Sequence, residues 1–155
     1  MDGGALELTL LGGLLTVEAT AAGQFMLSRP LVAGTLAGWV MGAPAEGFAL
    51  GALLEVYFLV AFPVGGARFP EAAPATVVAV GVAAPGGAGP LALAVATALV
   101  WGQLAGISTT GQRFLNGMLV APRGRPAGPR RVVVGHLAAL GLEFVRGLVL
   151  TATGL

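Results

Sequence analysis

Apolar side chains fill several long stretches of this chain, and short runs of proline, glycine and polar residues separate them. The pattern predicts six helices, at about residues 5–24, 30–41, 48–62, 74–84, 91–109 and 132–155. Pro30 suits the first turn of a new helix, so we place a break just before it. The segments 30–41 and 74–84 are too short to cross a hydrocarbon core that takes about 20 helical residues.

Short apolar segments interrupted by proline and glycine are typical of discontinuous or re-entrant helices, whose exposed backbone must be covered by protein or must line a cavity. The run Pro-Gly-Gly-Ala-Gly-Pro at residues 85–90 predicts a turn that makes 74–84 and 91–109 a hairpin. We therefore predict an all-α, polytopic membrane protein with broken or re-entrant helices and helical hairpins. Residues 1–155 form one membrane domain in this interpretation.

Composition supports a membrane environment. Hydrophobic residues make up 56% of the chain and charged residues only 10%, against about 25% charged in soluble domains. Residues 72–112 carry no charge at all, and the 26 glycines favour close helix packing in lipid. The net charge of +1 argues against a nucleic-acid partner. Without cysteine, and with His136 as its single histidine, the chain is expected to hold no metal and no cofactor.

Five of the eight arginines fall between Arg113 and Arg131. Four of them lie in a basic loop predicted at residues 121–131, which the positive-inside rule places in the cytoplasm. The alternative is an anion-binding patch.

Glu55 is the clearest charged residue within an apolar segment. An ionisable side chain at bilayer depth costs roughly 2.5–3.5 kcal/mol, so it needs a partner, a cavity or a function. Its carboxylate is suited to accept hydrogen bonds from sugar hydroxyls. The structural alternative is a buried pair with Arg29 that sets the helix register, and both interpretations are compatible.

Four other polar residues have similar alternatives. Gln24 beside the break could bind a polyol, or could cap a helix or bond to a neighbouring one, while Arg29 holds a carboxylate in place. Glu71 is either functional or an interfacial residue without a special role. Glu18 is either a substrate contact or a residue that sets register or lies at the interface.

The last predicted helix carries His136, Glu143 and Arg146, which crowd one side of it at 100° per residue. Glu143 and Arg146 are spaced as an i,i+3 ion pair. His136 suggests either a proton relay or a structural role. The sequence contains no nucleophile elbow, phosphate-binding loop or dinucleotide motif, so we expect no catalytic residues.

Three blocks of the sequence carry a resemblance to a known family. They are residues 24–34 (QFMLSRPLVAG), 47–55 (GFALGALLE) and 63–73 (PVGGARFPEAA), in this order and spacing. His136 and Arg146, ten residues apart, add to it. The chain resembles the IIC membrane subunit of the mannose/sorbose-type phosphotransferase system over nearly its whole length.

The resemblance implies a multi-pass sugar permease of the bacterial inner membrane. Such a subunit pairs with a IID subunit, moves a hexose-type sugar inward, and leaves phosphorylation to cytoplasmic IIA and IIB proteins. It implies sugar-site residues Gln24, Glu55 and Glu71, with Arg29 and Glu18 in support. We also expect a homo-oligomer. The alternative function is a non-transporting scaffold, assembly partner or regulator derived from this family, while broken helices and Glu55 argue against a simple pore.

Overall fold

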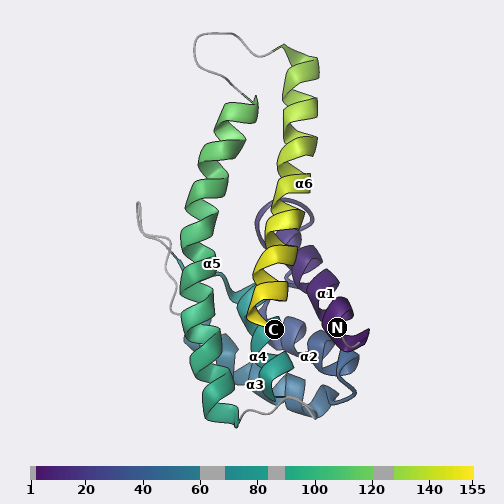
Figure 1. Cartoon of the computed structure of the whole chain (residues 1–155), viewed down its shortest axis with the longest axis vertical. Helices are drawn as coiled ribbons and strands as arrows, with labels where there is room; N and C mark the ends of the chain where they lie inside the picture. The colour runs from purple at the N-terminus through teal and green to yellow at the C-terminus, as the bar shows by residue number, and fades with distance from the viewer. Residues whose placement is uncertain (1–2, 60–68, 84–89, 121–127) are drawn as a thin grey trace.

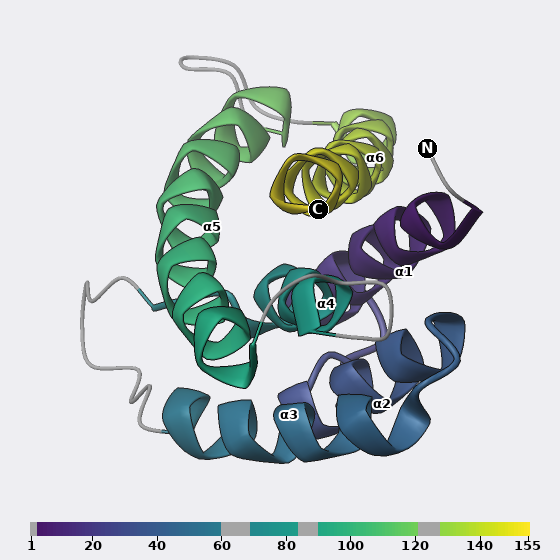
Figure 2. The ribbon, with the colours of Figure 1, turned by 60° about the horizontal axis from the view of Figure 1, so that its bottom comes forward.

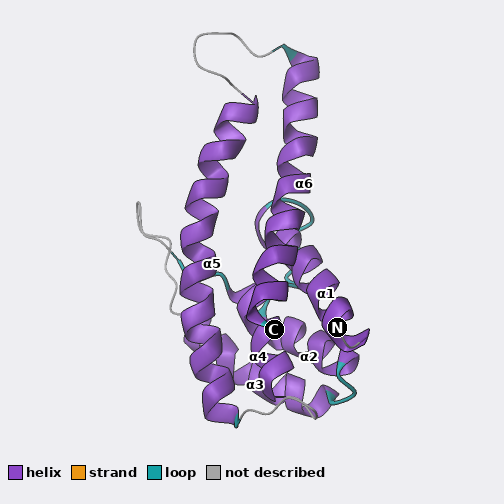
Figure 3. Ribbon diagram, viewed as in Figure 1, coloured by secondary structure: helices purple, strands orange, loops and turns teal. Residues whose placement is uncertain are grey.

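The computed structural model describes residues 3–59, 69–83, 90–120 and 128–155, which contain helices and connections but no strand (Figure 3). The helices are α1 (Gly3–Thr20), α2 (Pro30–Val40), α3 (Pro44–Phe58), α4 (Ala72–Ala83), α5 (Leu91–Val120) and α6 (Pro129–Gly154). Each predicted helical segment overlaps one of them. The prediction of an all-α fold is confirmed.

The helices α5 and α6 run side by side and project beyond the four shorter helices (Figure 1). With 30 and 26 residues, they are about 45 and 39 Å long at about 1.5 Å per residue. Both are long and apolar enough to cross a membrane. Their outer faces expose large apolar side chains, among them Val100, Leu104, Ile107, Phe114, Val133, Leu137, Val145 and Val149. These faces suit contact with lipid.

Helix α4 lies in the middle of the bundle, with α1, α5, α6 and the α2–α3 pair around it (Figure 2). All residues from 73 to 80 are buried. Its 12 residues span only about 18 Å, which is less than the hydrocarbon thickness of about 30 Å. A short helix enclosed by other helices is the broken-helix arrangement that the sequence predicts.

Helices α2 and α3 form a hairpin in which the two backbones touch. Gly34 and Gly38 on α2 face Gly47 and Gly51 on α3. A Cβ atom at Gly34 would lie 2.5 Å from the Gly47 carbonyl oxygen, and one at Gly38 would lie 2.7 Å from the Ala43 carbonyl oxygen. The four glycines therefore permit an approach that a side chain on either helix would prevent.

The first helix ends at Thr20, four residues before the end predicted at residue 24. Gly23, Gln24 and Met26 all have positive φ angles, of 93°, 53° and 66°. This left-handed backbone is incompatible with a continuing α-helix, although no proline precedes residue 30 to signal the break. Gln24 therefore lies in a connecting loop and not at a helix end.

Proline explains two further differences from the predicted boundaries. Pro44 occupies the first turn of α3, so this helix begins four residues before the predicted residue 48. Pro129 likewise opens α6 and places Arg130 and Arg131 on the helix instead of in the predicted basic loop. Residues 121–127 of that loop lie outside the described residues, as do residues 60–62 and 84 of two predicted helices.

Helix α5 continues eleven residues past the predicted end at residue 109. Two polar side chains in this part of the helix have hydrogen-bond partners within it. The Thr109 hydroxyl donates to the Ala105 carbonyl over 3.1 Å, and the Gln112 amide donates to Asn116 Oδ1 over 3.1 Å. Polar side chains satisfied in this way do not interrupt a helix.

Candidate functional site

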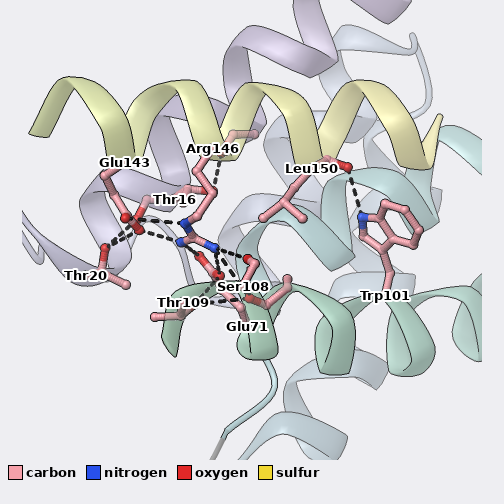
Figure 4. Close-up of polar contacts among 12 residues, drawn as sticks. Thr16, Thr20, Glu71, Trp101, Ser108, Thr109, Glu143, Arg146 and Leu150 are labelled. Carbon is pink, nitrogen blue, oxygen red and sulfur yellow. Dashed lines mark hydrogen bonds and ion pairs between the residues drawn. The ribbon is translucent and has the colours of Figure 1, made fainter. Parts of the chain in front are cut away.

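Arg146 of α6 is the centre of a buried ion network (Figure 4). Its Nη1 donates to Glu71 Oε2 over 2.7 Å and its Nη2 donates to Glu71 Oε1 over 2.9 Å, which makes the pair bidentate. Arg146 also pairs with Glu143, the i,i+3 partner expected from the sequence. The three side chains are only 10%, 7% and 6% exposed, in the order Arg146, Glu71, Glu143.

Hydroxyl groups from two other helices complete the network. Thr109 of α5 donates to Glu71 Oε2 over 3.0 Å, and Thr20 at the end of α1 donates to Glu143 Oε1 over 3.0 Å. Arg146 Nη1 also donates to the Ser108 hydroxyl over 2.9 Å. The network therefore joins α1, α5, α6 and the residue that precedes α4.

The backbone at Glu71 is fixed as well as its side chain. Its N–H donates to the Gly102 carbonyl on α5 over 2.9 Å. Nearby, the Trp101 indole N–H donates to the Leu150 carbonyl of α6 over 2.9 Å (Figure 4). These two bonds hold the start of α4 and the facing parts of α5 and α6 in place around the charges.

A polar cavity of about 280 Å³ adjoins the network. It is lined by Thr20, Ala21, Thr109, Gln112, Arg113, Asn116, His136, Ala139, Leu140 and Glu143. Three of these residues, Thr20, Thr109 and Glu143, also belong to the hydrogen-bond network. The cavity volume lies just below the range of about 300–1,000 Å³ for small-molecule sites, which suits a small polar solute.

The lining offers both hydrogen-bond donors and acceptors to a polar ligand, with Arg113 and Glu143 as side chains of opposite charge. Gln112 and Asn116 each offer donors and acceptors, threonine hydroxyls offer both, and Glu143 offers acceptors only. Among the residues that the structure describes, no group of three or more His, Asp or Glu side chains could hold a metal ion.

Glu55 lies away from this cavity and forms an ion pair with Arg29. Its Oε2 also accepts the Leu31 backbone N–H over 3.2 Å, at the start of α2. The Glu55 side chain is 17% exposed and that of Arg29 is 47% exposed. The pair considered from the sequence is therefore present, and it ties the beginning of α2 to α3.

Gln24 lies in the loop between α1 and α2, and Glu18 near the end of α1 bonds to the backbone of that loop. Gln24 is exposed, three residues beyond Ala21 of the cavity wall. Glu18 is buried, and its carboxylate accepts the backbone N–H of Leu27 over 3.3 Å and that of Ser28 over 2.9 Å. Glu18 thus holds the loop that presents Gln24.

Of the residues predicted for the site, only Glu71 belongs to the buried network, and Gln24 and Glu55 lie elsewhere. Sequence reasoning missed Thr20, Thr109, Gln112 and Asn116 as cavity residues. The spacing of Gln112 and Asn116, four apart on one helix face, was an available signal. His136 and Glu143, predicted to share one side of α6, both line the cavity.

Two helices long and apolar enough to cross a membrane, packed with shorter helices around the enclosed α4, are typical of a polytopic helical membrane protein. The family described as "PTS system sorbose-specific iic component" matches residues 4–124. The chain belongs to this family.

A solved structure has the same fold. The mannose transporter ManYZ, determined by electron cryomicroscopy in complex with microcin E492, contains a chain that matches with a TM-score of 0.83 and 20% identity. The match covers 99% of this chain and 62% of the other, so this chain spans less than two thirds of that relative's length. A search of curated proteins found no match.

Proposed function

We propose that this chain carries a hexose-type sugar inward across the bacterial inner membrane, as the multi-pass translocating subunit of its phosphotransferase system. In this proposal it works with a IID subunit in the membrane. Phosphoryl transfer is the task of cytoplasmic IIA and IIB proteins. We further propose that several copies of the chain assemble, and that the end of α6 with Arg130 and Arg131 faces the cytoplasm.

The observation that carries the proposal is the polar cavity between α1, α5 and α6. A sugar hydroxyl both donates and accepts hydrogen bonds, and the amides and hydroxyls of this cavity do the same. Placing polar groups inside a membrane protein costs free energy, so such groups usually bind a polar solute or an ion, or form hydrogen bonds and ion pairs with one another. Membership of the family supports a sugar as that solute.

The residues indicated by the resemblance have distinct roles in this proposal. Glu71 acts through Thr109, which bonds to its carboxylate and also lines the cavity. Gln24 contacts the sugar from the loop next to Ala21, and Glu18 keeps that loop in place. Glu55 contacts the sugar at another stage of transport, with Arg29 in support.

Uptake of labelled glucose and mannose, by cells that also express the partner subunits, tests the proposal. We expect Gln112→Ala and Asn116→Ala to reduce uptake at low sugar concentration by up to about tenfold each, the effect of one lost hydrogen bond of about 0.5–1.5 kcal/mol. Gln24→Ala and Glu55→Gln should also lose uptake. All four variants should reach the membrane in normal amounts.

Gln103→Ala is the matched control, because Gln103 is an exposed amide on the same helix α5 and does not line the cavity. It should transport as the unaltered protein does. Uptake that is unchanged in all four test variants would contradict a sugar route through this cavity.

A second proposal is a non-transporting scaffold or regulator, and one observation favours it. Both carboxylates expected to bind sugar already form ion pairs within the protein: Glu55 is paired with Arg29, and Glu71 is paired with Arg146. In this case calorimetry on the chain purified with its membrane partner would detect no sugar binding. Glu55→Gln would then alter stability alone.

A further inference from the structure

A second hollow lies between the projecting ends of α5 and α6. It is a groove of about 700 Å³ lined by Leu119, Gly128, Pro129, Arg130, Arg131, Val134, Gly135 and Ala138. It shares no residue with the polar cavity. Apart from the two arginines its side chains are aliphatic, so its chemistry is opposite to that of a site for a sugar.

Arg130 and Arg131 supply the charge at this groove. Both are exposed in the first turn of α6. Neither forms an ion pair with any acidic side chain in the part of the chain that the structure describes. Two adjacent cations at the rim of an apolar groove need an anionic partner that also carries an apolar part.

The depth of the groove in the membrane agrees with such a partner. Helix α6 is about 39 Å long, and a bilayer has a hydrocarbon core of about 30 Å between its headgroup layers. A helix of this length that crosses the core extends past it, and we place its first turn, which carries the two arginines, in a headgroup layer. Val134 and Ala138 lie one and two turns further along α6, at the level where acyl chains begin.

We propose that this groove binds an anionic phospholipid. The phosphate lies against Arg130 and Arg131, and one acyl chain lies along Leu119, Val134 and Ala138. Basic pockets between transmembrane helices bind the headgroups of anionic lipids by this combination of charge and depth. Free phosphate would use the arginines and leave the aliphatic wall exposed, so a lipid accounts for both parts of the groove.

The bound lipid would also fill the space between two helices that already touch. A Cβ atom at Gly135 would lie 3.1 Å from the Leu119 carbonyl oxygen, so α5 and α6 are in close contact beside the groove. A lipid anchored there holds the projecting ends of these helices together. This inference depends on the membrane position of α6 and not on sugar transport.

Native mass spectrometry of the whole chain in detergent tests the inference by titration with dioleoylphosphatidylglycerol, dioleoylphosphatidylethanolamine and inorganic phosphate. We expect the anionic lipid to bind more tightly than the zwitterionic one. Arg130→Gln and Arg131→Gln should each weaken its binding about fivefold, equivalent to about 1 kcal/mol per basic side chain near the membrane surface. Ala138→Phe, which leaves the charge unchanged, should weaken it about fourfold for each methylene it displaces.

Arg113→Gln is the control for charge, because Arg113 is exposed on α5 and lies outside the groove. It should leave lipid binding unchanged, and circular dichroism should show that all variants are folded. Equal binding of the two lipids by the unaltered protein would overturn the proposal, and so would anionic-lipid binding by the Arg130→Gln and Arg131→Gln variants as tight as that of the unaltered protein. Inorganic phosphate that binds as tightly as the anionic lipid, with no effect of Ala138→Phe, would identify a simple anion site and overturn it too.

Discussion

Replacing Arg146 by methionine should destabilise this protein more than any exposed substitution. The change removes the guanidinium that bonds to both oxygens of Glu71, over 2.7 and 2.9 Å, and pairs with Glu143. Methionine keeps a side chain of similar length, so the apolar packing is largely retained. Two buried carboxylates are then left without a cation.

The expected size of the effect follows from the burial of these groups. All three charged side chains are at most 10% exposed, so solvent cannot replace the lost partner. Removing one member of a buried ion pair typically costs about 3–5 kcal/mol, because the remaining charge is uncompensated. At 1.4 kcal/mol for each tenfold change, the unfolding equilibrium shifts by roughly two to four orders of magnitude.

Unfolding in mixed micelles, followed by circular dichroism, measures this free energy. Arg113→Met is the matched control, because Arg113 is exposed on α5 and such substitutions usually change stability by at most about 0.5 kcal/mol. Adding Glu71→Gln and Glu143→Gln to Arg146→Met removes the uncompensated charges and should restore most of the lost stability. The reasoning is refuted if Arg146→Met is no worse than Arg113→Met, or if the triple variant is as unstable as the single one.

Two further substitutions test the packing of the hairpin and the loop before it. Gly34→Ala should cost about 1–3 kcal/mol of unfolding free energy, since overpacking forces the backbones of α2 and α3 apart. Gly117→Ala, with nothing within 4 Å of the new methyl group, should instead raise the free energy of unfolding by up to about 1 kcal/mol in the same assay. Equal changes in Gly34→Ala and Gly117→Ala would contradict the close-contact argument. Glu18→Gln removes an acceptor oxygen from the loop N–H groups and should cost about 1–3 kcal/mol. Amide hydrogen exchange at Ser28 should then accelerate, and unchanged exchange would show that Glu18 does not hold the loop.

The helical architecture could be predicted from the sequence because its strongest signals are local. Pro30, Pro44 and Pro129 each open a helix, and the sequence interpretation used this property at Pro30 alone. The end of α1 was placed four residues too late, since Gln24 and Met26 adopt left-handed backbone that their side chains do not signal. Helix α5 extends eleven residues past its predicted end at residue 109.

The candidate site was harder to predict from the sequence, because it joins residues that are far apart along the chain. Helical periodicity identifies Glu143 and Arg146 as partners on one helix. Glu71 lies 75 positions before Arg146, and no local pattern relates the two. The spacing of Gln112 and Asn116 puts them on one face of α5, but the cavity that this face lines depends on how α1, α5 and α6 meet.

The glycine contacts between α2 and α3 also have a mechanical consequence. Where side chains separate two helices, rotamer changes let one helix shift against the other. Here carbonyl groups and Cα atoms meet directly, and a shift along the axis would drive one backbone into the other. The two helices of the hairpin should therefore move together as one rigid unit in any conformational change.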